Sequence, residues 1–314
     1  MLMDDTDPAK RIGVFFDAPN YDDYPFNNEE YVTAYHEIAG LLHAKGGRFH
    51  IVRSLSTFLG GNRFKGHWAF DGTTFVRDDG EIELDLVYDK GYFVGDARTR
   101  LLNDAEMNRI CVDKRETAKM FPDLTPKTVE VADKEGLERS LADWPSQTVV
   151  AKPVDGAEAE GVVIGSKDEV LAAAHSYPLL VQQFVDTSAG IPGIVDGVCD
   201  LRTIMIDGEI GLTYARQAKA GTLISNVSKG GREIEVLPEQ RPAEAMRIAK
   251  EIDDAFRPMS KHRVFSADLA PDRDGKWYLI ELNSKPGLSV RATGPTYPRY
   301  QELLVDALLS AANE

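Results

Sequence analysis

The first third of the chain combines short apolar runs with one helical pattern. RIGVFF (11–16) and RFHIVRS (48–54) have strand length, and the segment 29–47 between them carries apolar residues at helical spacing and ends in Gly46-Gly47. After a loop, LDLVYDKG (84–91) is a third apolar run. Strand, helix and strand in this order predict an α/β unit with a parallel sheet, and we place this first domain at residues 1–112.

From residue 113 onward the pattern changes to helices mixed with paired strands. Three hairpin signals are present: 148–165, 200–218 around Asp207-Gly208, and 264–283. Helical spacing is found over 113–121, 133–144, 167–177, 242–256 and 299–314. The last two thirds of the chain are therefore predicted to be α+β with antiparallel sheets, which we divide into 113–185 and 186–314.

The stretch LIELNSKPG (279–287) is an apolar strand that turns polar before a Lys-Pro-Gly turn. Side chains alternate along a strand, so Glu281 and Asn283 share one face, and Asp268 joins them if the two strands of 264–283 pair. Two carboxylates and one amide suit a hard cation such as Mg²⁺. The alternative is a hairpin whose acids face water.

VVAKPVDGAEAEGVVIG (149–165) ends an apolar strand with Lys152 and continues into a loop containing Gly156 and Gly161. Backbone N–H groups of such a loop, together with the lysine, suit nucleotide phosphates. Glu158 and Glu160 in the same loop would repel phosphate unless they point outward. An ordinary hairpin with a snorkelling lysine is the alternative.

Two further stretches are candidates on weaker signals. LLVQQFV (179–185) is an apolar strand ending in a polar pair, which fits a hinge against an adenine edge but also fits plain core. Arg202 and Arg216 fall on the two strands of 200–218, where paired guanidinium groups suit a phosphoryl group or an oxyanion. Asn226 follows in a loop that could shape a substrate site. Surface charge is the alternative for either arginine.

Composition narrows the class of protein. The net charge of −15 argues against nucleic-acid binding, because a polyanion would be repelled. No apolar run is long enough to span a bilayer, and the acidic start, MLMDDTDPAK, is not typical of a signal peptide. Two cysteines are too few for a disulfide framework or a zinc cluster. We expect a soluble, cytoplasmic protein with no nucleic-acid or membrane partner.

The order of these features resembles the ATP-grasp superfamily, and within it the RimK-type and glutathione-synthetase-like carboxylate–amine ligases. The resemblance runs from about residue 112 to the C-terminus. Its most specific parts are DLR (200–202), SNVSKGG (225–231) and ELNSKPGL (281–288), with Asp268 in the expected place. It implies two antiparallel α+β lobes that clamp ATP behind an α/β domain.

The resemblance also implies roles for individual residues. Lys114 and Lys152, with the loop of Gly156 and Gly161, would hold phosphates, and Asp200 would hold the ribose. The segment Gln182 to Val185, which includes Gln183, would form the adenine hinge, with backbone contacts from Phe184 and Val185. Arg202 and Arg216 would bind and stabilise the phosphoryl and acyl oxygens. Arg202 or Asn226 would stabilise a tetrahedral oxyanion. Asp268, Glu281 and Asn283 would bind two Mg²⁺ ions, with Mn²⁺ as an alternative.

Several positions depart from the family pattern. The phosphate loop has fewer glycines than usual, Gln183 stands where relatives usually have an acid, and Lys229 stands where RimK-type enzymes usually have arginine. The segment 186–198 is longer than in RimK-type enzymes. These departures concern the subfamily and leave the three metal positions intact.

The implied activity is ATP-dependent joining of a carboxylate and an amine through an acyl phosphate, giving ADP and phosphate. The substrates would be amino acids, short peptides or peptide-like metabolites, and homo-oligomers are common among the relatives. The alternatives are a small-molecule kinase and a nucleotide-binding protein with weak catalysis. Candidate substrate contacts, each with a solvated loop as the alternative, are Tyr21, Asp22 and Asn27, the cluster of Arg63, Lys65 and His67, and Arg291.

Overall fold

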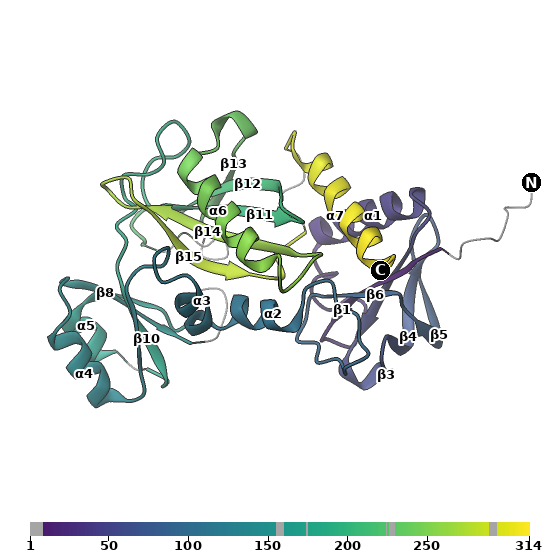
Figure 1. Cartoon of the computed structure of the whole chain (residues 1–314), viewed down its shortest axis with the longest axis horizontal. Coiled ribbons are helices and arrows are strands. Elements are labelled where there is room, and N and C mark those ends of the chain that lie inside the picture. Colours follow the sequence, from purple (N-terminus) through teal and green to yellow (C-terminus); the bar gives the residue numbers. More distant parts are fainter. Residues whose placement is uncertain (1–8, 155–159, 174, 224, 226–229, 289–293) are drawn as a thin grey trace, which may run out of the picture.

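The chain is built on three β-sheets of six, four and five strands (Figure 1). The computed structural model describes residues 9–154, 160–173, 175–223, 225, 230–288 and 294–314. Gly156, Glu158, Asn226, Lys229 and Arg291, which the sequence singled out, lie outside these residues. Within the described part of the chain, no helix combines the length and apolar character needed to cross a membrane.

The first sheet contains the predicted strand–helix–strand unit. Strand β1 (Arg11–Phe16) pairs in parallel with β2 (Arg48–Arg53) on one side and β6 (Leu86–Asp89) on the other. Helix α1 (Glu29–Ala44) connects β1 to β2 and is capped at its N-terminus by Asn28, whose side chain accepts a hydrogen bond from the Glu30 N–H at 2.9 Å. The α/β prediction for this part of the chain is confirmed.

The loop predicted between β2 and β6 is wrong, because this segment forms three more strands. They are β3 (Phe58–Gly60), β4 (Arg63–Phe70) and β5 (Phe75–Glu83). β4 pairs antiparallel with β2, β3 and β5, so the sheet is mixed rather than purely parallel. β5 is an edge strand with a run of exposed charged residues, and this polar sequence carries no apolar alternation that would predict a strand.

The second sheet has the order β7-β10-β8-β9 and is antiparallel throughout. Its strands are β7 (Thr128–Val131), β8 (Thr148–Pro153), β9 (Val163–Ser166) and β10 (Leu179–Gln183). Helices α4 (Lys134–Ala142) and α5 (Lys167–Ala172) lie together against it, and Leu137, Val149 and Val170 share the core between them (Figure 1). This is the α+β lobe that the resemblance implied.

The third sheet has the order β13-β12-β11-β14-β15 and is also antiparallel. Its strands are β11 (Cys199–Ile206), β12 (Glu209–Gln217), β13 (Arg232–Glu235), β14 (Val264–Pro271) and β15 (Trp277–Asn283). Helix α6 (Ala243–Phe256) packs on one face, where Ile248 and Phe256 join Leu201 and Leu269 in a second core. Both hairpins predicted for this region are present.

Three helices connect the sheets. α2 (Ala105–Val112) and α3 (Lys114–Met120) follow each other between the first and second sheets and contact β15, while α7 (Tyr297–Ala312) packs against α1 and β12 (Figure 1). One continuous core therefore runs from the first sheet through α7 to the third sheet, with Tyr35 and Leu304 among its buried residues. The division at residues 112 and 185 stays a prediction.

Candidate active site

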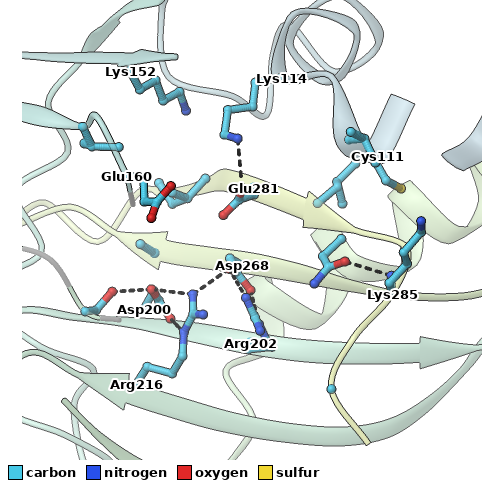
Figure 2. A pocket seen from close by; sticks show the side chains of 18 of the residues that line it. Cys111, Lys114, Lys152, Glu160, Asp200, Arg202, Arg216, Asp268, Glu281 and Lys285 are labelled. Carbon is cyan, nitrogen blue, oxygen red and sulfur yellow. Dashed lines mark hydrogen bonds and ion pairs between the residues drawn. The ribbon is translucent and has the colours of Figure 1, made fainter. Parts of the chain in front are cut away.

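A cavity of about 640 Å³ lies between the second and third sheets and extends to the first. Its walls include Lys152 and Phe184 from the second sheet and its end, Asp268 from the third sheet, and Lys90 from the end of β6. Figure 2 shows Lys114 and Lys152 on one side of it, and Asp200, Arg202, Arg216 and Asp268 on the other. Segments from all three parts of the sequence thus meet at one site.

The third sheet contributes a polar face, and strand register explains how that face is assembled. Asp268 on β14 lies directly opposite Glu281 on β15 and opposite Arg202 on β11, so their side chains share a face. Asn283 pairs with Ser266, two residues before Asp268, on the same face. The register of β14 and β15 shifts between Asp268 and Leu269, and such bulges commonly re-aim side chains beside active sites.

Four side chains on this face form one charge network, namely Asp200, Arg202, Arg216 and Asp268. Asp268 accepts hydrogen bonds from Arg202 Nε at 2.6 Å and Nη2 at 2.7 Å, and from Arg216 Nη2 at 2.6 Å. Arg216 also donates to both oxygens of Asp200, at 2.7 and 2.9 Å. The Ser225 hydroxyl donates to Asp200. Two carboxylates and two guanidinium groups balance, so the network carries no net charge (Figure 2).

The two carboxylates of this network differ in pKa. Burial would raise the pKa of Asp268, but Arg202 and Arg216 outweigh it and hold the pKa at about 2. Burial raises the pKa of Asp200, because Arg216 offsets only part of the penalty and Asp268 adds repulsion. Asp268 is therefore the firmly ionised member.

Lys152 lies on the opposite wall with an amide as its partner. Its Nζ donates to Gln182 Oε1 at 2.9 Å, and Gln182 Nε2 in turn donates to the Thr128 hydroxyl at 2.8 Å. Burial is the main reason that the pKa of Lys152 falls to about 8, and Lys114 adds to the effect while Glu281 opposes it. A buried ammonium held by a neutral amide is well suited to receive an anion.

Lys114 links the second wall to the third sheet. It is the first residue of α3, whose N-cap is Asp113, and its Nζ lies 3.3 Å from Glu281 Oε1. The two lysines that the sequence assigned to phosphate therefore lie on the same side of the cavity, facing the predicted metal ligands (Figure 2).

The predicted metal ligands fit a hard cation by chemistry and position. Asp268, Glu281 and Asn283 offer carboxylate and amide oxygens from two adjacent strands. Each already has a protein partner. Arg202 and Arg216 contact Asp268, Lys114 contacts Glu281, and the Lys285 backbone N–H donates to Asn283. Among the described residues, no three His, Cys, Asp or Glu side chains group closely enough to hold a metal. Asn283 and oxygens of the substrates or water would have to complete the shell, as is usual for Mg²⁺.

The predicted nucleotide contacts are divided between described and undescribed residues. Gln183, Phe184 and Val185 all line the cavity, as the hinge prediction requires. Gly161 adopts a left-handed φ of +68°, and a Cβ there would approach Pro153 to 2.9 Å, so the turn requires glycine. Glu160 also lines the cavity and does not point away from it (Figure 2).

The substrate contacts suggested for the first domain are not brought to this cavity. Tyr21 instead stacks on Phe26, with ring centroids 4.9 Å apart, and neither Asp22 nor Asn27 is a lining residue. Arg63, Lys65 and His67 all lie on β4, outside the cavity. Among the residues that do line it, sequence reasoning missed Tyr24, Tyr31, Lys90, Tyr92 and Lys285. The position of Lys90 at the end of an apolar strand was the available signal.

The model of the RimK-like ATP-grasp domain matches residues 124–294, and the chain belongs to that family. Solved structures agree in fold: a D-alanyl-alanine synthetase A from Vibrio cholerae has a TM-score of 0.63 and 13% identity over 98% of this chain and 99% of its own. The VanG D-Ala:D-Ser ligase from Enterococcus faecalis gives 0.64 and 14% over 97% and 99%. The ATP-grasp fold is thereby confirmed.

Curated relatives match over a shorter stretch. A probable alpha-L-glutamate ligase from Hydrogenovibrio crunogenus is 30% identical over 148 residues, which is 45% of this chain and 43% of that protein. The corresponding protein from Thioalkalivibrio sulfidiphilus is 30% identical over 159 residues, or 47% and 46%. The chain thus spans less than half the length of the curated relatives it matches.

Proposed function

We propose that the protein is an ATP-dependent ligase that joins a carboxylate to an amine. The observation that carries this proposal is a cavity, also lined by Asn283, in which Lys114 and Lys152 face Asp268 and Glu281 in a chain of the RimK-like ATP-grasp family. Cations opposite oxygen donors are what transfer of a phosphoryl group to a carboxylate requires. The relatives named as glutamate ligases support the reaction class.

The proposed nucleotide position follows the walls of the cavity. The backbone of Phe184 and Val185 would meet the adenine edge, Asp200 the ribose, and Lys114 and Lys152 the phosphates, with Gly156 and Gly161 in the covering loop. Because Arg216 and Ser225 already hold Asp200, a ribose hydroxyl would have to share its carboxylate. Residues 113–185 and 186–314 would be the two lobes, and residues 1–112 the substrate domain.

The reaction has two balanced steps. A carboxylate oxygen of the substrate attacks the γ-phosphorus of ATP, and ADP leaves, giving an acyl phosphate. The amine then attacks the acyl carbon, the carbon–oxygen bond to phosphate breaks, and the amine loses a proton as phosphate departs. Arg202 and Arg216 would offset negative charge on the transferred group, and Asn226 or Arg202 the tetrahedral oxyanion. Asp268, Glu281 and Asn283 would hold Mg²⁺, proposed as two ions, and the bound metal would supply positive charge that offsets the charge of the phosphates.

The test is phosphate release from ATP and Mg²⁺ across a panel of amino acids and dipeptides, alone and in pairs. We expect release only when the compound that serves as the carboxylate substrate and the compound that serves as the amine substrate are both present. Glu281→Ala should lose roughly 10–100-fold or more, since even outer-shell partners of metal ligands contribute that much. Glu251→Ala, which removes an exposed carboxylate of α6 paired with Arg247, is the control and should keep full activity.

Two outcomes would point to the other candidates. A phosphorylated product without an amine would indicate a kinase. Binding of ATP without turnover on any pair would favour a nucleotide-binding protein, a reading supported by the Glu160 carboxylate in the cavity wall. In that case Glu160→Gln should strengthen ATP binding, because it removes the repulsion of phosphate.

A further inference from the structure

The end of the cavity nearest the first sheet has its own chemistry. It is lined by Phe16, Tyr24, Tyr31, Lys90 and Tyr92, which come from strand ends and loops of the first sheet and from α1. The carboxyl ends of β1 and β6 open there, and the crevice outside such ends is where α/β sheets bind ligands. This end therefore differs from the end that faces the adenine hinge.

Lys90 is a charged group of this region for which the described residues provide no ion pair. It directly follows β6, its backbone N–H donates to Phe15 O at 3.0 Å, and its ammonium group donates to the Pro286 carbonyl. The Tyr88 ring lies 5.1 Å from Nζ. In the described part of the chain, no carboxylate is in ion-pair contact with it. Burial, followed by repulsion from Lys285, lowers its pKa to about 7, and the charge of Asp89 opposes this only in part.

The neighbouring lysine shows the contrast. Lys285 Nζ lies 2.6 Å from Asp89 Oδ2 and also contacts the Gly91 carbonyl, while the Tyr92 ring is 5.1 Å from Nζ. Asp89 thus forms its ion pair with Lys285, whereas the direct contacts of the Lys90 ammonium group are the Pro286 carbonyl and the Tyr88 ring, with Asp89 acting on it only at longer range. An ammonium group in such a position is stabilised by an incoming anion.

Aromatic rings stand beside this cation and are accessible. Tyr24 and Tyr92 are 61% and 72% exposed, which is unusual for rings that line a cavity. The Tyr24 and Tyr31 hydroxyls are 3.1 Å apart and their rings are at 68°. A Cβ on Gly287 would come within 2.9 Å of the Tyr31 hydroxyl, so this close approach needs glycine.

The loop that carries Tyr24 is fixed in place by one buried side chain. The Arg53 guanidinium, at the end of β2, donates to the carbonyls of Ala18, Tyr21 and Asp23 at 3.0, 3.1 and 3.0 Å. It also stands 5.1 Å from the centroid of the Phe16 ring. We call the rings of Tyr24, Tyr31 and Tyr92 the aromatic wall. The loop that carries its Tyr24 ring is held in place before any ligand arrives, which lowers the entropy cost of binding.

From these observations we infer that this end of the cavity is a subsite for a substrate bearing both a carboxylate and an aromatic ring, with Lys90 contacting the acid and Tyr24, Tyr31 and Tyr92 contacting the ring. The inference rests on the proposed function for the reaction, but the binding itself needs no turnover. It distinguishes this chain from an enzyme that takes only an aliphatic acid such as glutamate.

The test measures binding by calorimetry to the whole protein with Mg²⁺ and ADP present. Three probes separate the two contributions: 3-phenylpropanoate has acid and ring, 3-phenylpropanamide has the ring alone, and hexanoate has the acid alone. We expect 3-phenylpropanoate to bind at least roughly 10-fold more tightly than either of the others, because a charge-assisted contact and a ring contact are each removed in turn.

Variants then assign the contacts. Lys90→Met should weaken the binding of 3-phenylpropanoate roughly 10-fold and leave ADP affinity unchanged. Tyr24→Ala should reduce the preference for 3-phenylpropanoate over hexanoate. Lys65→Met, which changes an exposed side chain of β4 outside the cavity, is the control and should change nothing. If hexanoate binds as well as 3-phenylpropanoate, or Lys90→Met binds like the wild type, the inference is overturned, and the ligase proposal is unaffected. If the expected binding occurs but no pair yields phosphate, the subsite stands and the ligase proposal fails.

Discussion

Lys152 illustrates how the surroundings of one side chain set its behaviour. The same residue on a surface would carry a full charge at any physiological pH, whereas burial beside Gln182 lowers its pKa to about 8. Its unfolded value lies near 10.5. The unfolded chain binds the proton more tightly, so this group lowers the free energy of unfolding by its full amount below about pH 8. As the pH rises from 8 to 10.5, the free energy of unfolding should increase until this penalty disappears.

Nucleotide binding should reverse this effect. Phosphate oxygens favour the charged form, so binding of ADP with Mg²⁺ at about pH 8.5 should take up a fraction of a proton, and affinity should fall as the pH rises above about 8. Calorimetry in two buffers of different ionisation enthalpy measures the uptake. Lys152→Arg should bind with little uptake, because arginine stays charged. Proton release, or uptake equal in the variant, would show that Lys152 does not contact the phosphates.

Individual site residues were predictable where alternation along a strand decides the outcome. Glu281 and Asn283 were placed on one face from their spacing, and Asp268 beside them from the hairpin, and the register of β14 and β15 confirms this arrangement. The ion pairs were not predictable. Arg216 meets Asp200 only because β11 and β12 pair in a particular register, and the sequence does not state that register.

Among the elements, α6 is joined to the third sheet by a buried ion pair as well as by its apolar face. Arg263, just before β14, donates from Nε and Nη2 to the two oxygens of Asp253 on α6, at 2.8 and 2.7 Å. The side chains of Arg263 and Asp253 are 3% and 0% exposed. Burying such a pair costs desolvation free energy. Replacing one partner destabilises the protein more than replacing both by apolar residues, because it leaves the other charge buried and unpaired.

Arg263→Met should therefore lower the free energy of unfolding by about 3–5 kcal/mol, because it leaves the Asp253 carboxylate buried with only Lys250 nearby at 3.3 Å. Adding Asp253→Leu should restore most of that loss. Urea unfolding followed by circular dichroism gives the values, with Arg247→Met on the exposed side of α6 as control. A double variant no more stable than Arg263→Met would contradict this interpretation of the pair.

The failure to predict β5 from the sequence has a physical cause. β5 presents charged residues along most of its length and pairs on one side only, with β4, so its sequence resembles a loop. Helix α1 and strand β14, by contrast, were recognised from their apolar residues. Amphipathic patterning identifies an element that covers a core, and it fails for an edge strand whose backbone pairing alone holds it.

For the molecule as a whole, the two ends of the sequence define the cavity together. Helix α7, from the last residues, packs against α1 from the first domain, and the shared core includes Tyr35, Tyr300 and Leu304 (Figure 1). This contact holds the first sheet beside the third, so that the aromatic wall and Lys90 face the same space as Asp268 and Glu281. Contacts between residues so far apart leave no local pattern, which is why the first-domain lining was missed.

The proposed ligation can be traced by one isotope. The protein is given ATP, Mg²⁺ and a pool of amino acids whose carboxylates carry ¹⁸O, and the mass of the released phosphate is measured. If a carboxylate attacks the γ-phosphorus and an amine then breaks the carbon–oxygen bond, each phosphate should carry one ¹⁸O, and Glu281→Ala should release almost none. Unlabelled phosphate alongside ADP, or AMP with pyrophosphate, would contradict an acyl-phosphate ligase.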